Sequence, residues 1–264
     1  MKTIPVALVT GGSRGIGRGI AIELAQTGLS VAINYAGNAE AAAECRRMCE
    51  QAASSEKAKF IAYQADITRR EDRVRLLEAV VKDFGWIDLL VNNAGVAPRV
   101  RKDMLEVGEE SFDSLMAVNV KGPFFLTQAV SNFWLSSPEE LKAHERKPKI
   151  VTITSVSTYA PGVTRSEYCL SKAALAMLTP LFAIRLAEHG INVYEIRPGV
   201  VKTDMTKVVQ AKYEQMIAGG LTPIKRWGTP EDVGRAVVAI VEERFPFSTG
   251  EVLNVDGGFH IRAL

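Results

Sequence analysis

Short apolar runs rich in β-branched residues alternate along the chain with longer segments in which apolar residues recur every three or four positions. The short runs are typical of buried strands and the longer segments of amphipathic helices. Strands joined through helices pair in parallel by right-handed crossovers. The predicted strands are residues 6–9, 31–34, 59–64, 89–92, 150–154, 192–197 and 252–255, and the predicted helices are residues 16–27, 40–53, 71–84, 112–134 and 167–189. We therefore expect an α/β fold, with a doubly wound parallel sheet of about seven strands and helices on both faces.

The 264-residue chain has no break in composition that would mark a linker, so we expect one domain over residues 1–264. It carries 32 Lys and Arg against 30 Asp and Glu, and this near balance argues against nucleic acid or a membrane as partner. Three cysteines offer no disulfide framework, and Cys45 and Cys49 lack further ligands at metal-site spacing. Without a signal segment or a run of 18 apolar residues, we expect a cytoplasmic protein with no metal.

A glycine-rich turn, TGGSRGIG at residues 10–17, joins the first predicted strand to the first predicted helix. Glycines let backbone amides and the helix N-terminus approach a pyrophosphate, so this turn predicts a dinucleotide site in a single-domain Rossmann fold. The second strand ends in Asn34 and Tyr35, where a carboxylate would repel a 2′-phosphate, and the first acid is Glu40. Arg14 supplies a cation for such a phosphate, unless it is only a solvated loop residue. We therefore expect NADP (NADPH) rather than NAD.

Two more strand ends are predicted to face the nucleotide. Asp66 and Ile67 follow the third strand, and the sequence Asn-Asn-Ala-Gly at residues 92–95 follows the fourth. Asx residues and glycine also favour plain turns, so each stretch alone has a structural explanation. The division expected from these positions is a nucleotide-binding half over residues 1–95 and a catalytic and substrate half over residues 96–264.

A tyrosine and a lysine, Tyr168 and Lys172, stand four positions apart in a predicted helix and share one of its faces. An ammonium one turn away favours the phenolate and lowers the pKa of a tyrosine that acts as an acid or base. This spacing also occurs by chance in many helices. Ser155, at the carboxyl end of the fifth strand, lies on the side of the sheet where the glycine turn is expected, and so favours the catalytic interpretation.

These motifs together resemble the short-chain dehydrogenase/reductase family over nearly the whole chain. The resemblance implies hydride transfer between nicotinamide and a carbonyl or alcohol carbon. Tyr168 would exchange the proton, Ser155 would hydrogen-bond the reacting oxygen, Lys172 would bind the nicotinamide ribose, and Asn119 would hold a water linked to Lys172. The residues expected at the cofactor are Thr10, Gly11, Ser13, Arg14, Gly15, Ile16, Gly17, Asn34, Tyr35, Asp66, Ile67, Asn93, Ala94, Gly95, Tyr168, Lys172, Pro198, Gly199 and Thr203. A catalytically silent dinucleotide sensor is the remote alternative.

Within the family, the motifs are most similar to those of 3-oxoacyl-[acyl-carrier-protein] reductases and of sugar or polyol dehydrogenases. An acidic carrier protein needs a basic rim, and the candidates are Arg99, Arg101, Lys102, Arg165, Lys225 and Arg226, unless they are merely solvated. Glu188 and His189, where carrier-protein reductases tend to be basic, weaken that interpretation. Residues 202–228 are predicted to form a lid and residues 136–149 a surface excursion, and Pro180 should bend or end its helix. The resemblance also implies a homotetramer.

Overall fold

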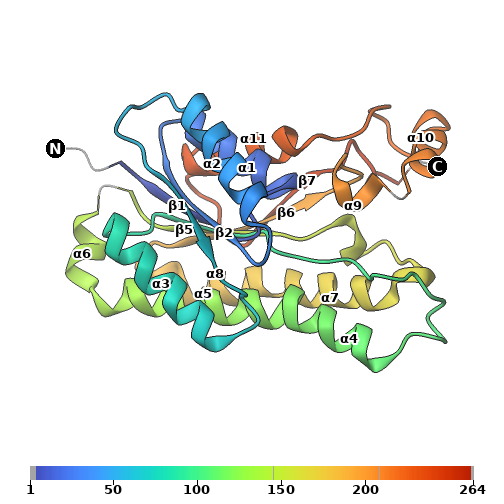
Figure 1. Cartoon of the computed structure of the whole chain (residues 1–264), viewed down its shortest axis with the longest axis horizontal. Coiled ribbons are helices and arrows are strands. Elements are labelled where there is room, and N and C mark those ends of the chain that lie inside the picture. The colour runs from blue at the N-terminus through green and yellow to red at the C-terminus, as the bar shows by residue number, and fades with distance from the viewer. Residues whose placement is uncertain (1–3, 145, 208, 263–264) are drawn as a thin grey trace.

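The computed structural model describes residues 4–144, 146–207 and 209–262. In this part of the chain seven parallel strands form one sheet in the order β3-β2-β1-β4-β5-β6-β7, as Figure 1 shows. The strands are β1 (Val6–Val9), β2 (Ser30–Tyr35), β3 (Phe60–Gln64), β4 (Leu89–Asn92), β5 (Lys149–Ile153), β6 (Asn192–Pro198) and β7 (Glu251–Val255). The predicted doubly wound sheet is confirmed. Its order reverses between β1 and β4, and sheets of this kind bind ligands beyond the carboxyl ends of the strands at that point.

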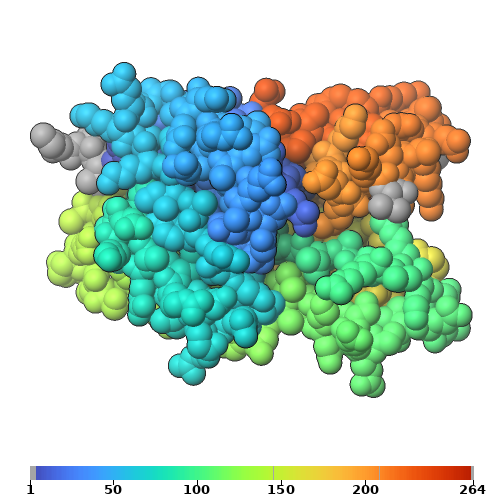
Figure 2. All heavy atoms as spheres, in the orientation of Figure 1, coloured from blue at the N-terminus to red at the C-terminus, as the bar shows by residue number. Residues whose placement is uncertain are grey.

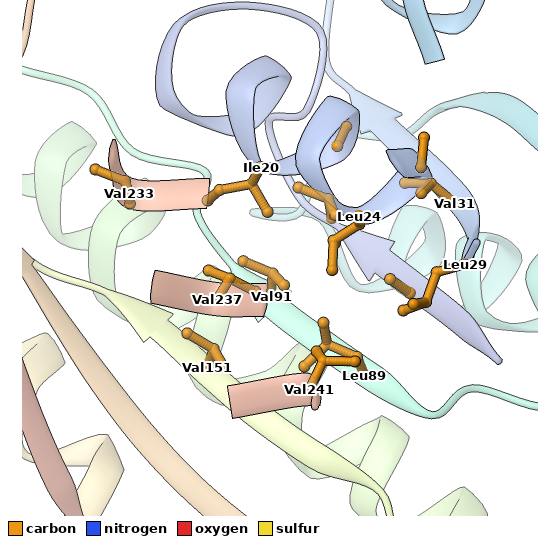
Figure 3. Packing of buried hydrophobic residues seen from close by; sticks show 14 of the residues in the cluster. Ile20, Leu24, Leu29, Val31, Leu89, Val91, Val151, Val233, Val237 and Val241 are labelled. Atoms are coloured by element: carbon orange, nitrogen blue, oxygen red, sulfur yellow. The ribbon is translucent and has the colours of Figure 1, made fainter. Parts of the chain in front are cut away.

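Helices cover both faces of the sheet (Figure 1). On one face lie α1 (Gly15–Gln26), α2 (Ala39–Ala52) and α11 (Pro230–Val241), and on the other lie α3 (Arg70–Phe84), α4 (Glu109–Met116), α5 (Gly122–Ser136), α7 (Ser166–Ala176) and α8 (Leu178–Leu186). Successive strand residues point to opposite faces, so Leu8 enters one apolar cluster while Val9 enters the other. In Figure 3, Ile20 of α1 and Val237 of α11 pack toward Val91 of β4. Burial on both faces explains why the strands read as continuous apolar runs.

The helix expected over residues 167–189 is divided in the structure. α7 ends at Ala176, α8 begins at Leu178, and the amide of Met177 donates to the Ala174 carbonyl three residues back. Pro180 has no amide proton for the Ala176 carbonyl, so the predicted interruption is confirmed. The stretch Val163–His189 is long and apolar enough for a membrane span, at 27 residues and a mean hydropathy of 1.5. Only 39% of the most apolar window of this stretch is buried, and one such helix among the described residues is weak evidence for a membrane.

The predicted helix over residues 112–134 begins earlier and contains a wider turn. α4 runs into a π-helical segment, Ala117–Lys121, which continues as α5. Sequence periodicity did not predict this segment. π-helical turns inside α-helices often occur at functional sites, and this one carries Asn119.

The two irregular stretches differ in position. The stretch at residues 136–149 holds the short helix α6 (Pro138–Ala143), at the end of the molecule away from the glycine turn. The stretch at residues 202–228 holds α9 (Asp204–Lys207) and α10 (Gln210–Ala218). Figure 2 shows the orange α9 and α10 region facing the green segment that follows β4. The lid function of residues 202–228 stays a prediction.

Candidate active site

The glycine turn at residues 10–17 joins the end of β1 to the start of α1. Gly11 and Gly15 have φ angles of +59° and +55°, which L-residues rarely adopt. A Cβ added at Gly17 would overlap the Gly11 carbonyl and lie 2.5 Å from Asn93 Nδ2. The turn is therefore a cradle built from backbone at a helix N-terminus, which fits the pyrophosphate of a dinucleotide.

Two residues expected at the cofactor, Asn34 and Asn93, hold this turn in place with their side chains. Asn93 Nδ2 donates to the carbonyls of Thr10 and Gly11 at 2.8 and 3.1 Å. Asn34 Oδ1 accepts from the Gly11 amide at 3.4 Å, and Asn34 Nδ2 donates to the Ala65 carbonyl at 3.0 Å. These contacts give both side chains a structural role. Their predicted cofactor contacts stay predictions.

After β3, the side chain of Asp66 stabilises a turn, which was the structural explanation considered for this stretch. Asp66 Oδ1 accepts from the amide and hydroxyl of Thr68 at 2.9 and 2.8 Å. Ile67 is buried, and a Cβ at Gly122 would approach its side chain to 2.9 Å. Asp66 therefore shapes the end of β3 whether or not it also contacts a nucleotide.

The segment after β6 meets the glycine turn. A Cβ at Gly15 would lie 3.5 Å from Thr203 Cγ2, and a cavity of about 250 Å³ is lined by Arg14, Gly15, Lys202 and Thr203 among others. Gly199 packs so closely on the residue after β7 that an added Cβ would lie 2.7 Å from Asp256 Cα. The glycine turn and the segment around Thr203, two predicted parts of the cofactor site that are far apart in the sequence, are therefore adjacent in the structure.

The catalytic candidates converge at the carboxyl end of β5. Ser155 follows β5, and its Oγ accepts from the Ser157 amide at 3.1 Å at the start of a 3₁₀ turn (Val156–Thr158). On α7, Lys172 Nζ lies 5.9 Å from the centre of the Tyr168 ring. The same Nζ donates to the carbonyl of Ile153, the last residue of β5 and two positions before Ser155, at 3.0 Å. The predicted triad is thus brought together by one strand end and one helix face.

Asn119 lies beside this group and is completely buried. Its side chain donates to Ser171 Oγ at 2.9 Å and to the Val96 carbonyl at 3.0 Å, and it accepts from the Val96 amide at 2.8 Å. A Cβ at Gly95 would lie 3.3 Å from Asn119 Oδ1 and 3.4 Å from Lys172 Nζ. The side chain of Asn119 therefore joins α7 to the segment after β4, and its predicted water stays a prediction.

Burial is the main cause of the pKa shifts of Tyr168 and Lys172. It raises the pKa of Tyr168, and hydrogen bonding from Ser155 and the charge of Arg165 only partly offset that rise. Burial also lowers the pKa of Lys172 to about 8, against the opposing charge of Glu195. The lowering of the Tyr168 pKa that the sequence led us to expect is not found, because desolvation dominates. At neutral pH Tyr168 is a protonated acid and Lys172 a cation.

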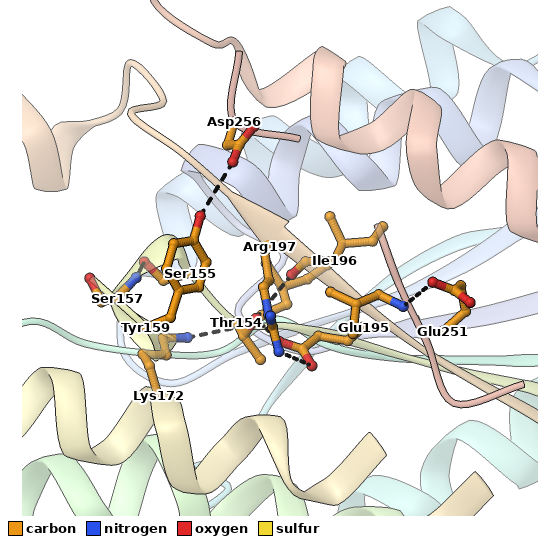
Figure 4. Close-up of polar contacts among 12 residues, drawn as sticks. Thr154, Ser155, Ser157, Tyr159, Lys172, Glu195, Ile196, Arg197, Glu251 and Asp256 are labelled. Atoms are coloured by element: carbon orange, nitrogen blue, oxygen red, sulfur yellow. Dashed lines mark hydrogen bonds and ion pairs between the residues drawn. The ribbon is translucent and has the colours of Figure 1, made fainter. Parts of the chain in front are cut away.

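Several polar residues behind the site were missed from the sequence. Glu195 and Arg197 of β6 pair beneath Thr154, and Tyr159 Oη donates to Asp256 at 3.4 Å (Figure 4). The one signal was a Glu and an Arg inside a strand predicted to be buried. The expected basic rim is also changed, because Arg226 binds Asp232 through both guanidinium Nη atoms at 2.7 and 2.9 Å.

Comparison with known proteins identifies the family of the chain. A family model described as enoyl-(acyl carrier protein) reductase matches residues 11–260. The chain is 32% identical to the 3-oxoacyl-[acyl-carrier-protein] reductase FabG of Staphylococcus epidermidis, over 97% of this chain and 98% of the relative. It is 34% identical to 2-dehydro-3-deoxy-D-gluconate 5-dehydrogenase of Escherichia coli, over 97% and 96% of the two chains.

A solved structure matches over both full lengths. It is the crystal structure of a 3-oxoacyl-[acyl-carrier protein] reductase from Brucella melitensis in complex with NAD, with a TM-score of 0.88 and 40% sequence identity over 100% of each chain. The glycine turn, the Ser155, Tyr168 and Lys172 group and these matches lead to one conclusion. The chain belongs to the short-chain dehydrogenase/reductase family of oxidoreductases.

Proposed function

We propose that the protein reduces a carbonyl to an alcohol with NADPH, and that the substrate is a 3-oxoacyl thioester. The observation that carries this proposal is the convergence of Ser155 and Tyr168 beside Lys172, at the end of the sheet that holds the glycine turn. The comparisons support the substrate class, because several relatives are named 3-oxoacyl-[acyl-carrier-protein] reductases.

The roles of the residues follow from their surroundings. A bound nicotinamide cofactor would supply the hydride. Tyr168, whose pKa burial raises, gives its proton to the carbonyl oxygen as negative charge develops there. The Ser155 hydroxyl donates to the same oxygen and stabilises that charge. Lys172, a cation below about pH 8, would hold the ribose hydroxyls of that cofactor and would favour the phenolate left after proton transfer.

Preference for NADPH rests on Arg14 and on the end of β2. The Arg14 side chain is exposed beside the turn, and no carboxylate stands at residues 34–38 to repel a 2′-phosphate. The NAD complex of the Brucella relative favours the other cofactor. We expect a lower Michaelis constant for NADPH than for NADH, and expect Arg14→Ala to remove most of the difference. A wild-type preference for NADH contradicts this assignment.

The substrate is tested by following NADPH oxidation with acetoacetyl thioesters beside a panel of sugars and polyols assayed for oxidation. Exposed Arg99, Arg101 and Lys102 on the segment after β4 support a carrier-protein substrate. The second candidate, a sugar or polyol dehydrogenase, is favoured by the similarity to 2-dehydro-3-deoxy-D-gluconate 5-dehydrogenase. Turnover of the thioesters alone supports the first candidate, and turnover of a polyol alone supports the second. Dinucleotide binding without any turnover would support a silent sensor.

A homotetramer in the cytoplasm is part of the proposal. Four apolar side chains are exposed along α7, Met177 and α8: Leu170, Met177, Leu181 and Ile184. Ile184 is 83% exposed, and contiguous apolar surface of this kind is typical of a contact between protein chains. This row supports assembly with further copies of the chain. We expect light scattering after size exclusion to give about four times 28.8 kDa.

A further inference from the structure

A buried charged pair lies on strand β6 behind the catalytic lysine. The Glu195 side chain is 1% exposed and that of Arg197 is 24% exposed. A buried carboxylate destabilises the fold unless it is well paired, so the position of Glu195 requires an explanation. Neighbouring β6 positions Tyr194 and Ile196 are apolar or aromatic and buried, as a central strand requires.

The carboxylate is held from two strands. Glu195 Oε1 accepts from Arg197 Nε at 2.6 Å and from Thr154 Oγ1 at 2.5 Å, and Oε2 accepts from Arg197 Nη2 at 3.2 Å. Thr154 follows Ile153, whose carbonyl accepts from Lys172 Nζ at 3.0 Å. Consecutive residues at the end of β5 therefore fix the Glu195 carboxylate and the Lys172 ammonium (Figure 4).

Thr154 binds the Glu195 carboxylate and the preceding residue, Ile153, binds the Lys172 ammonium, so the two charges are held by neighbouring residues. Desolvation lowers the pKa of Lys172 and the charge of Glu195 opposes that fall, which leaves a pKa of about 8. Other elements around Lys172 contribute mainly neutral groups, since Asn119 and Gly95 lie on one side and Tyr168 one turn back. Further charged side chains on these elements include Lys121 on the π-helical segment, Lys149 on β5, Arg165 before α7, Glu167 on α7 and Arg197 on β6. Glu167 accepts from Ser111 Oγ at 3.0 Å, and Lys149 donates to Glu243 at 2.8 Å.

We propose that Glu195 is a positioning residue that keeps the buried Lys172 charged at neutral pH, with Arg197 and Thr154 fixing the carboxylate that does so. The proposal rests on the proposed function for its effect on turnover, but its effect on Lys172 does not depend on any substrate. Arg197 reaches solvent and tempers the field of Glu195. The two residues should consequently act on Lys172 with opposite signs.

Opposite signs separate this role from a structural one. A pair that only joins β6 to β5 would lose stability when either partner is changed, and would leave the titration of Lys172 where it was. If the pair acts on the charge of Lys172, the titration midpoint of Lys172 falls when the Glu195 carboxylate is neutralised and rises when the Arg197 guanidinium is removed. Removing both partners together is the milder change to the fold, because no buried charge is left unpaired.

The test is an NMR titration of full-length protein labelled with ¹³C- and ¹⁵N-lysine, with the Lys172 signal assigned by its loss in Lys172→Met. We expect Glu195→Gln to lower the midpoint of Lys172, because the opposite charge that favours its ammonium form is removed. Arg197→Gln should raise the midpoint, and the Glu195→Gln, Arg197→Gln double variant should fall between the two. Glu251→Gln, an exposed carboxylate on the adjacent strand β7, is the matched control and should leave it unchanged.

A second readout is the pH profile of carbonyl reduction, whose fall at high pH should move with the midpoint in each variant. An unchanged midpoint in Glu195→Gln, or shifts of the same sign in both single variants, overturns the proposal. Opposite shifts in a protein that reduces no carbonyl would refute the proposed function and leave the positioning role standing.

Discussion

Replacing Gly17 by alanine tests the glycine cradle most sharply, because helix propensity and packing predict opposite signs. Gly17 lies inside α1, where alanine is favoured over glycine by about 1 kcal/mol. The added Cβ would overlap the Gly11 carbonyl and lie 2.5 Å from Asn93 Nδ2, and both groups are fixed by the bonds between them. Forcing extra atoms into such packing costs about 1–3 kcal/mol of folding free energy. We expect a cost near the upper value, because the Gly11 carbonyl is part of the backbone and cannot move away.

The net expectation for Gly17→Ala is a loss of about 2 kcal/mol, which lowers the melting temperature by about 4–8 °C at this chain length. NADPH affinity, measured by the fluorescence of the bound cofactor, should fall as well, because the turn must open. Gly108→Ala is the control, since a Cβ there meets nothing within 4 Å. Gly108 is the N-cap of α4, so this change should cost about 0.5–1 kcal/mol and leave NADPH affinity unchanged. A Gly17→Ala protein more stable than wild type, with unchanged NADPH affinity, would refute the steric argument.

Three further predictions concern the catalytic pair and the exposed apolar row. Tyr168→Phe should reduce turnover by at least about 100-fold while the NADPH dissociation constant stays within about twofold, and substantial residual turnover would remove Tyr168 from its role. Lys172, with a pKa of about 8, is mostly charged at pH 7 and mostly neutral at pH 9, so binding that needs its charge should weaken about tenfold over that interval. Lys172→Met should flatten this dependence, and an equally steep dependence in the variant would contradict it. Ile184→Asp should dissociate the tetramer in light scattering, whereas an unchanged mass would place the contact elsewhere.

The sheet could be predicted from the sequence because its strands are buried on both faces. β1 and β4 have the predicted bounds, and the others differ by a residue at one or both ends. The break before Pro180 followed from the missing amide proton. The π-helical turn at Ala117–Lys121 could not be predicted, since one extra residue in a turn scarcely changes the spacing of apolar positions.

The candidate site was predictable in its residues but not in their surroundings. The spacing of the motifs identified Ser155, Tyr168 and Lys172. Hydrophobic periodicity predicts that Ser155 lies at the end of a strand and that Tyr168 and Lys172 share one face of a helix. The sign of the Tyr168 pKa shift depends on burial, which spacing does not give. Glu195 was missed for a related reason, since a charge in a buried strand is explained only by the partners that the fold brings to it.

The central claim, carbonyl reduction by NADPH with Tyr168 as the acid, is tested most directly by following the transferred hydride. A single turnover with NADPH carrying deuterium at both C4 positions of the nicotinamide and an acetoacetyl thioester should place deuterium on C3 of a 3-hydroxyacyl product, as read by mass spectrometry. Tyr168→Phe should bind the same labelled cofactor and transfer none within that time. Deuterium transferred only to the carbon–carbon double bond of an enoyl thioester, or to no substrate of the panel, would contradict the account.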